Sequence, residues 1–282
     1  MKGLRHWMML AFWLAAGPCS ALACALVVPG HWSLDGYDPA QASGRAEPQA
    51  IRVQAGKGCQ AWLRVEWQGL AGDLPLAGPG ASNLRLALST DSAGASPLQP
   101  APQDAALFQL EAGREALFYL WARPLPGQWI EPGTYTALLR LSLVGTAGTL
   151  AERELPVSIN VKAAVRAGFA GSGGKLARLD FGELAQGLQR SVGLDVQANT
   201  GHRVTLESTQ RGRLVNRRFS QSAISYRLRV AGVVVSAEAS GAGISIPSAG
   251  QARHRIEVEI GPVEKVLAGD YEDDLLITIT AQ

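Results

Sequence analysis

Side chains that could perform catalysis are few in this sequence and share no spacing. Three histidines follow the N-terminal segment, His31, His202 and His254, and none stands at a characteristic distance from a cysteine or a carboxylate pair. No His-Glu-x-x-His, Gly-x-Ser-x-Gly or Cys-x-x-Cys sequence occurs. Zinc peptidase, serine hydrolase and dithiol redox chemistry therefore lack their usual residues. We interpret the histidines as surface residues and expect a protein that is not an enzyme and has no cofactor.

The acidic residues are densest at one place, where Asp270, Glu272, Asp273 and Asp274 follow one another. Carboxylate oxygens of this kind can hold Ca²⁺. The same charges would also discourage uncontrolled pairing if they stand at the start of an edge strand. We favour the second interpretation and predict no metal site.

The N-terminus is typical of a secretory signal peptide. Lys2 and Arg5 precede an apolar run, and the small residues Ala21 and Ala23 stand where a signal peptidase reads the chain. The apolar run is too short to span a bilayer comfortably. We predict a signal peptide over residues 1–23, export from the cytoplasm and no membrane anchor.

Cleavage after Ala23 changes both the charge and the cysteine count. Lys2 and Arg5 account for the whole basic excess, since the chain has 26 Lys and Arg against 24 Asp and Glu. A formally neutral chain argues against nucleic acid as a partner. Only Cys24 and Cys59 remain after cleavage. In an oxidising compartment a disulfide is the default state for such a pair.

Short segments of alternating apolar and polar residues recur along the chain, and no stretch shows an apolar stripe of helical period. This pattern is typical of all-β sandwiches. A glycine-rich stretch within residues 163–174 divides the strands into two sets. We predict strands at 51–53, 62–67, 84–88, 106–110, 116–121, 135–144 and 155–161, and then at 179–181, 192–196, 204–206, 224–230, 233–235, 256–260 and 271–280.

A short repeat links the two sets. Tyr135 and Tyr271 each follow a glycine by two positions, and each begins a strand whose apolar residues have the same spacing. After the first copy, a turn near 145–149 leads into a second alternating strand, which predicts a hairpin. After the second copy the sequence has only Ala281 and Gln282. We therefore expect a second domain without its closing strand, and a sheet edge that a strand from another chain can complete.

Two apolar loops distinguish the first set, which also contains every tryptophan after the signal peptide. Loops of this composition can form a contact patch. They can equally fold back over an open end of the sandwich, and both interpretations remain open. The candidate surface-binding residues are Leu70, Leu74 and Leu76 in one loop and Leu125, Trp129 and Ile130 in the other.

Several motifs together resemble the spore coat protein U domain, the pilin module of Csu-type archaic chaperone-usher pili. In the second half they are Leu179-Asp180-Phe181-Gly182, residues 196–199 and Ala268-Gly269-Asp270-Tyr271-Glu272-Asp273. In the first half they are Cys24, residues 34–39, Cys59 and residues 132–135. The sequence departs from the family in two respects, because its second half has no cysteine pair and Leu34-Asp35-Gly36 replaces the usual Phe-Gly.

The resemblance implies two immunoglobulin-like β-sandwich domains in tandem, an adhesin-like domain at 24–163 and a pilin domain at 164–282. It implies that the second domain lacks its last strand, that a periplasmic pilus chaperone holds its groove, and that an outer-membrane usher exchanges the chaperone for a donor strand of the next subunit. The donor-strand groove is expected to comprise Leu179, Phe181, Leu275, Ile277 and Ile279.

Family subunits that donate a strand carry an N-terminal extension before their first cysteine, whereas cleavage after Ala23 would leave Cys24 first. We therefore predict a tip adhesin, exported through the periplasm to the cell surface, that binds abiotic or host surfaces and supports biofilm formation. The alternatives are a periplasmic pilus chaperone, which also has two immunoglobulin-like domains, and a minor pilin without an adhesive role.

Overall fold

The structure is a computed structural model and describes residues 24–41, 44–54, 59, 61–69, 73–98, 108–109, 115–171, 174–238 and 241–282. These residues form strands, turns and loops without a helix, so the prediction of an all-β protein is confirmed. No element of this part of the chain is an apolar helix long enough to cross a bilayer. The predicted signal peptide lies outside the described residues.

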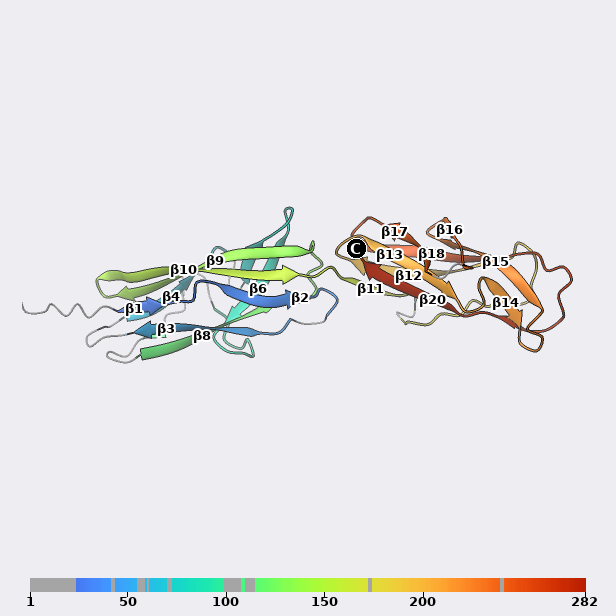
Figure 1. Cartoon of the computed structure of the whole chain (residues 1–282). Helices are drawn as coiled ribbons and strands as arrows, with labels where there is room; N and C mark the ends of the chain where they lie inside the picture. The colour runs from blue at the N-terminus through green and yellow to red at the C-terminus, as the bar shows by residue number, and fades with distance from the viewer. Residues whose placement is uncertain are drawn as a thin grey trace, which may run out of the picture.

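Two immunoglobulin-like sandwiches follow one another along an elongated molecule (Figure 1). The first contains β1 (Ala25–Val27), β2 (Trp32–Tyr37), β3 (Glu47–Gln54), β4 (Ala61–Glu66), β5 (Asp73–Ala77), β6 (Asn83–Ser89), β7 (Phe108–Gln109), β8 (Glu115–Pro124), β9 (Gly133–Gly145) and β10 (Gly148–Val161). Hydrogen bonds connect them in the order β1-β3-β8-β6-β5-β9-β10-β2, with β4 beside β9 and β7 beside β4. The hairpin predicted from the sequence is confirmed, since β9 and β10 pair antiparallel over their whole length.

The second sandwich contains β11 (Val165–Phe169), β12 (Gln189–Ala198), β13 (His202–Ser208), β14 (Arg213–Asn216), β15 (Ala223–Val230), β16 (Val233–Val235), β17 (Ala242–Ile246), β18 (Gly250–Ile260), β19 (Tyr271–Glu272) and β20 (Leu275–Ala281). One sheet has the order β11-β12-β18-β15-β14-β19, with β16 beside β15, and the other has the order β17-β13-β20. Strands β11 and β20 are thus end strands of different sheets.

The two sandwiches differ in how completely they cover their apolar side chains. Most members of the first core have almost no exposed surface, from Leu26 to Val161. In the second sandwich, the partly buried apolar side chains around the main core outnumber the fully buried ones. Alternation of apolar residues along twisted strands builds both cores, but among the described residues the first core is more completely buried than the second.

Several strands differ from the predicted ones. Residues 179–181 are not a strand, although Leu179 and Phe181 do pack against the second core. The glycine-rich stretch 163–174, which was expected to separate the two sets of strands, contains β11. Strands β1, β2, β5, β14 and β17 were not predicted, because each is short or is interrupted by Gly or Pro. Three of the residues predicted as strand 106–110 lie outside the described structure, which assigns β7 to the other two.

Candidate functional site

The repeat seen in the sequence forms the same local structure twice. The Tyr135 hydroxyl donates a hydrogen bond to the Glu131 carbonyl at 2.8 Å, and the Tyr271 hydroxyl donates one to the Leu267 carbonyl at 2.5 Å. In both cases the acceptor lies four residues before the tyrosine. This arrangement is the tyrosine corner of immunoglobulin-like domains, in which a tyrosine hydroxyl binds back to the preceding backbone.

Glycine is required two residues before each tyrosine. Gly133 has a φ of 142° and Gly269 a φ of 148°, values that residues with a side chain rarely adopt. A Cβ at Gly133 would lie 2.6 Å from a side-chain carbon of Pro79, and one at Gly269 would lie 2.7 Å from the Asn216 amide nitrogen. The repeated Gly-x-Tyr motif is thus explained by the backbone that it forms.

The strands that follow the two corners have equivalent neighbours on one side. Strand β9 pairs antiparallel with β4, where Val65 lies opposite Leu141. Strand β20 pairs antiparallel with β13, where Leu206 lies opposite Ile277. Because Leu141 and Ile277 each follow their tyrosine by six residues, the two pairs occupy the same position in their sandwiches.

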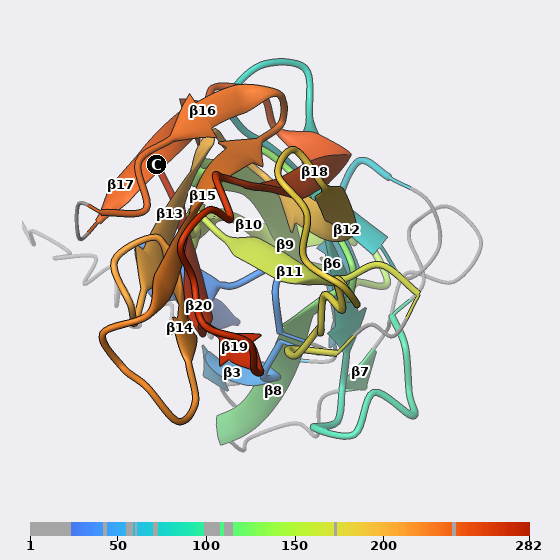
Figure 2. The same ribbon diagram turned by 90° about the vertical axis from the view of Figure 1, so that its right-hand side faces the viewer.

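The other side of these strands is where the sandwiches differ. In the first, β10 pairs antiparallel with β9 and also parallel with β2, so it fills the space between them. In the second, β20 pairs only with β13 among the described strands, and β11 pairs only with β12. Figure 2 looks along the molecule from the second sandwich and shows β11 and β20 near each other, with β16 and β17 at the opposite edge.

The burial of the inward side chains differs between β9 and β20 in the same way as the strand pairing. Leu139, Leu141 and Leu143 of β9 have no exposed surface, whereas their equivalents on β20 are only partly buried. Partly buried apolar side chains of β11 and of the loop after it lie around the same core. We call this set the acceptor strip: Val165, Ala167, Phe169, Leu179, Phe181, Leu275, Ile277 and Ile279.

The five residues predicted for the groove, Leu179, Phe181, Leu275, Ile277 and Ile279, all pack partly buried around the second core, and their role in binding a strand stays a prediction. Sequence analysis missed the contribution of β11, because the glycines after it suggested a linker. The alternation of Val165, Ala167 and Phe169 was the signal that could have revealed the strand.

One carboxylate of the acidic cluster points into the second sandwich. Asp273 accepts hydrogen bonds from the Tyr226 hydroxyl at 2.5 Å, the Ser208 hydroxyl at 2.6 Å and the Gln210 backbone at 2.9 Å. Burial and this carboxylate raise the pKa of Tyr226 above its ordinary value. Glu272 instead pairs with Arg217 at 3.2 Å on the surface. The cluster therefore orients the entry of β20 rather than forming one site.

The predicted surface-binding loops are not where the sequence suggested. Leu74 and Leu76 are buried in β5, so their assignment to an exposed loop was wrong. The loop with Leu125, Trp129 and Ile130 lies at the junction of the two sandwiches, and all three side chains are partly buried. Leu70 lies outside the described residues. Leu74 and Leu76 belong to the first core, and Ile130 packs against it.

Asn199 joins the two sandwiches at this junction. Its side-chain amide donates to the carbonyls of Ile130 and Lys162, both at 2.9 Å, and its side-chain oxygen accepts from the Ala164 backbone at 2.8 Å. The side chain is buried. Beside it, the Arg166 guanidinium stands 5.9 Å from the centre of the Trp129 ring, a cation–π distance.

Two histidines expected at the surface are buried, which corrects that interpretation. His202 and His254 lie in the second sandwich with their Nε2 atoms 3.0 Å apart. Burial lowers the pKa of both imidazoles, and for His202 the charge of its neighbour lowers it further. His31 is exposed and contacts the Ser158 hydroxyl at 2.7 Å. The pair cannot be read from the sequence because β13 and β18 are brought together only by the fold.

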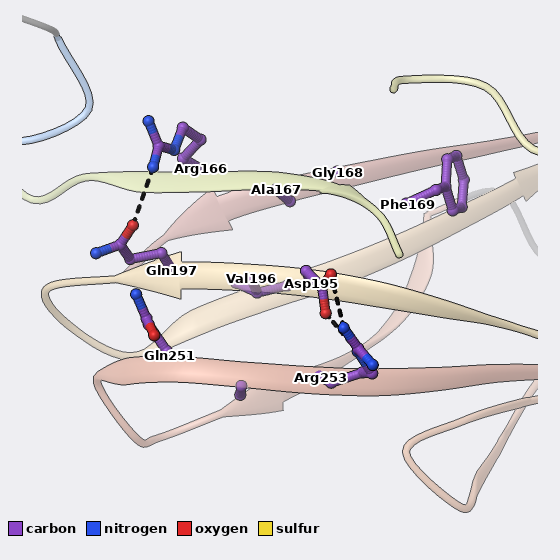
Figure 3. Close-up of a pocket in the computed structure, with 10 residues that line it drawn as sticks. Arg166, Ala167, Gly168, Phe169, Asp195, Val196, Gln197, Gln251 and Arg253 are labelled. Atoms are coloured by element: carbon purple, nitrogen blue, oxygen red, sulfur yellow. Dashed lines mark hydrogen bonds and ion pairs between the residues drawn. The ribbon is translucent and has the colours of Figure 1, made fainter. Parts of the chain in front are cut away.

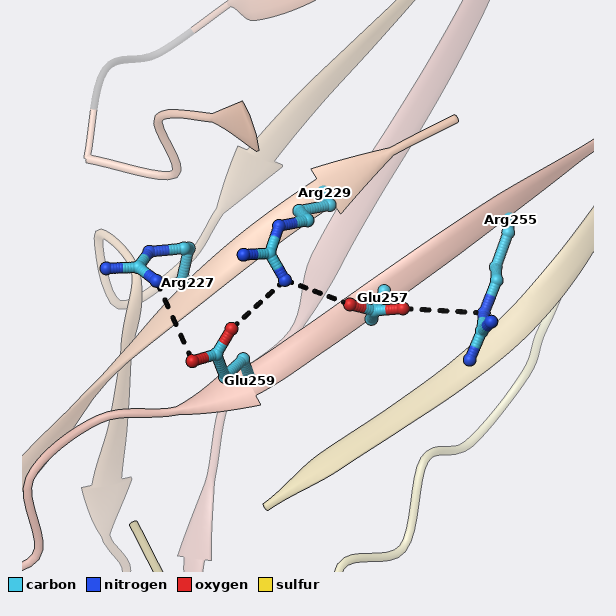
Figure 4. Close-up of polar contacts among 5 residues, drawn as sticks. All are labelled: Arg227, Arg229, Arg255, Glu257 and Glu259. Atoms are coloured by element: carbon cyan, nitrogen blue, oxygen red, sulfur yellow. Dashed lines mark hydrogen bonds and ion pairs between the residues drawn. The ribbon is translucent and has the colours of Figure 1, made fainter. Parts of the chain in front are cut away.

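The outer face of the second sandwich is polar. A shallow depression on β11, β12 and β18 is lined by Arg166, Gln197, Asp195 and Arg253 among others (Figure 3). Arg253 pairs with both oxygens of Asp195 at 2.5 and 3.1 Å and holds the pKa of that carboxyl below its ordinary value. A row of alternating arginines and glutamates continues across β15 and β18 (Figure 4): Arg227, Glu259, Arg229, Glu257 and Arg255. This face is suited to water rather than to an apolar strand.

The predicted disulfide is present. Cys24 is bonded to Cys59, with their Cα atoms 5.7 Å apart. The bond lies directly before β1, which pairs with β3. The residues immediately after Cys24 are thus already part of the first sandwich.

Comparison with known proteins gives structural likenesses only. No family model matches the sequence, and no curated protein matches it. The structure is similar to that of one chain in a complex of the chaperone CsuC and the tip adhesion subunit CsuE of archaic Csu pili from Acinetobacter baumannii, with 15% identity, a TM-score of 0.49, and 91% of this chain and 99% of the other covered.

Two further likenesses are of the same kind. CfaE, the adhesive subunit of CFA/I fimbria of enterotoxigenic Escherichia coli, has 12% identity, a TM-score of 0.43, and coverage of 91% of this chain and 94% of the other. The CupB6 tip adhesin from Pseudomonas aeruginosa has 11% identity, a TM-score of 0.38 and the same coverages. At these identities the likeness alone does not assign a function. The chain is similar in structure to tip adhesins of chaperone-usher pili.

Proposed function

We propose that this protein is an adhesive subunit of a chaperone-usher pilus, and that its second domain, residues 164–282, is completed by a strand from another subunit. The observation that carries the proposal is the outer side of β20, which no described strand pairs with, beside the partly buried acceptor strip. At the equivalent place in the first sandwich, β10 fills the space.

The first sandwich also defines the geometry of the incoming strand. Strand β10 runs antiparallel to β9 and parallel to β2. The partner's strand is therefore expected to run antiparallel to β20 and parallel to β11. Leu155, Val157 and Ile159 of β10 point inward and are buried, so the partner's strand needs apolar side chains at alternating positions.

Entry of the strand requires β11 and β20 to separate. At their closest, Cα atoms of these two strands lie within 8 Å of each other. A strand paired on both sides needs about 9–10 Å, which is twice the usual spacing between paired strands. The acceptor strip of the free subunit is thus partly collapsed, and strand binding should open it.

An acceptor strip without a bound strand would give the free subunit a reason to bind a chaperone. Full burial of a Leu or Ile side chain contributes about 1.5–3 kcal/mol relative to exposure, and part of this contribution is missing along β20. A partly exposed apolar strip beside a strand edge that no described strand pairs with favours aggregation. We propose that a periplasmic chaperone covers the strip, and that an outer-membrane usher replaces it with the next subunit's strand.

For adhesion, we propose the outer face of β1, β3 and β8. Val27, Leu117 and Tyr119 on this face are 46–49% exposed, although outward positions of a solvated sheet are usually polar. Val27 and Leu117 flank Arg52 across three neighbouring strands. The charge of Arg52 is neutralised by Glu115 at 2.7 Å. A neutral, apolar face suits attachment to apolar abiotic or host surfaces and biofilm formation.

A position at the pilus tip follows if the subunit accepts a strand and donates none. Cys24 and β1 are built into the first sandwich, so a donated segment would have to precede Cys24. Signal peptide cleavage after Ala23 would remove this segment. N-terminal sequencing of the exported protein tests this step, and an extension of a dozen residues before Cys24 would contradict the tip position.

The experiment that tests the function is purification of an internally tagged protein from the periplasm and from the cell surface of its host, followed by mass spectrometry of what co-purifies. We expect a stoichiometric chaperone in the periplasm and another pilus subunit at the surface. A stable monomer without a partner in both fractions would refute the proposal.

The adhesive role is tested separately with Leu117→Ser and Tyr119→Ser in one chain. Both side chains are exposed, so folding should be preserved. Attachment to polystyrene should fall while the number of pili stays unchanged. Unchanged attachment would refute an adhesive role of this face and would favour the alternative of a minor pilin without an adhesive role.

A further inference from the structure

The end of the second sandwich that points away from the first contains β14 and the segments around it (Figure 1). Apolar side chains are exposed at this end. Phe219 and Leu267 are 45% and 46% exposed there. Near them, other apolar side chains that are only partly buried pack against a small buried core of Leu214, Ile224 and Ile260. We call this surface the end patch, formed by Leu184, Phe219, Val263, Val266, Leu267 and Tyr271.

Ser222 fixes the geometry of the end patch. Its backbone N–H donates to the Phe219 carbonyl at 2.9 Å, and its hydroxyl accepts from the Leu267 backbone at 3.1 Å. The same hydroxyl lies 2.7 Å from the Tyr271 hydroxyl. Phe219 and Leu267 are thus held beside the tyrosine corner, and their exposure is not the result of a loose loop.

The end patch is continuous with the acceptor strip. Phe181 and Tyr226 pack against both the main core and the small core beneath the end patch. A strand lying along the acceptor strip therefore leads directly to the end patch.

The direction of the incoming strand decides which part of the partner meets this surface. Strand β11 starts at the junction with the first sandwich, and a strand parallel to it leaves at the opposite end, where β14 lies (Figure 1). Tyr271 is at this end because it pairs with Asn216 of β14. A donated segment is followed along its chain by the body of the donating subunit. That body must emerge next to Phe219 and Leu267.

We propose that the end patch binds the folded body of the subunit that donates the strand, as a second contact beyond the strand itself. This inference rests on the proposed function. The contact is apolar and is bordered by the ion pair between Arg217 and Glu272, whose side chains are both more than 60% exposed. The partner should therefore present an apolar surface with a polar rim directly after its donated strand.

Site-specific photocrosslinking in the host separates the inference from the proposed function. The photoreactive residue replaces Leu276, which is exposed on β20, or Phe219 or Leu267 in the end patch. Val234 on β16 is the matched control, because it is 58% exposed but lies at the other edge of the sandwich. All four positions are exposed, so the variants should fold.

We expect capture of one and the same subunit from positions 276, 219 and 267, and none from 234. Capture from 276 alone would overturn the inference and leave the proposed function intact. No capture of a subunit from position 276 would overturn the proposed function. It would also remove the direction of the incoming strand, from which the role of the end patch was inferred.

A binding measurement gives the second test. The chain with Phe219→Ser and Leu267→Ser is compared with the unchanged chain for binding to the subunit captured from position 276, and to a synthetic peptide of that subunit's N-terminal segment. Affinity for the whole subunit should fall about tenfold or more, as is typical when central apolar contacts are removed. Affinity for the peptide should be unchanged. Equal affinities of both chains for the whole subunit would overturn the inference.

Discussion

The two equivalent positions Leu141 and Ile277 allow a matched test of whether the second sandwich is open beside β20. Leu141→Ala removes a side chain with no exposed surface. It leaves a closed cavity, which typically costs about 2–5 kcal/mol of unfolding free energy. Ile277→Ala removes a side chain that already has part of its surface in water. The space that it leaves opens to solvent, so we expect a smaller loss, about 1–2 kcal/mol.

Denaturant unfolding of the chaperone-free protein checks this expectation, with tryptophan fluorescence reporting the first sandwich. All five tryptophans after residue 23 belong to that half, while circular dichroism reports both halves. The fluorescence transition should shift for Leu141→Ala and not for Ile277→Ala.

Strand binding should give the opposite ranking. Ile277→Ala should weaken binding of the next subunit's strand peptide, because the lost contact is made mainly in the complex, while Leu141→Ala should leave it unchanged. If Ile277→Ala costs the free protein as much as Leu141→Ala and leaves peptide binding unaltered, the side is closed and the reasoning is wrong.

Three further predictions follow from the same geometry. A copy of residues 146–161 appended after Ala281 should fold back as the missing hairpin strand, raise the unfolding midpoint of the second sandwich and abolish chaperone binding in a pull-down. The buried His202–His254 pair should make the free energy of unfolding fall as pH drops below about 6.5, the ordinary pKa of histidine. The reason is that the folded state, in which both pKa values are lowered, binds fewer protons than the unfolded state. Thermal melts should show a lower melting temperature at pH 5 than at pH 7.5, and His254→Gln should reduce this difference. Asn199→Ala should cost about 1–3 kcal/mol and broaden the distance distribution between spin labels on the two sandwiches, and an unchanged distribution would show that the Asn199 hydrogen bonds do not set their orientation.

Sequence analysis predicted the fold well where a pattern is local. The alternation in 135–144 and 155–161 predicted β9 and β10, and the short glycine turn between them predicted their pairing. The repeat around Tyr271 predicted the equivalence of β9 and β20, because a tyrosine corner is made within five residues. These features depend on neighbours in sequence.

Features that depend on distant residues could not be predicted. Whether Leu74 is exposed depends on β9, since β5 lies between β6 and β9, and the proline and glycines around it suggested a loop. The position of Trp129 depends on Asn199 and Arg166, which come from the other sandwich. The apolar composition indicated that these residues are covered by other groups. It could not indicate whether the covering groups belong to this chain or to a binding partner.

The two sandwiches show how one strand arrangement can give either a closed or an open domain. Both have the same corner, the same inward spacing after it and the same neighbour on one side. In the first, the closing strand is joined by a two-residue turn, so its ordering costs little entropy and the core closes within the chain. In the second, the inward residues of β20 stay partly covered, and the free energy of covering them remains available for association. If the second sandwich takes up a partner's strand as proposed, the burial that β20 lacks in the free chain would be gained on binding and would contribute to the affinity for that strand.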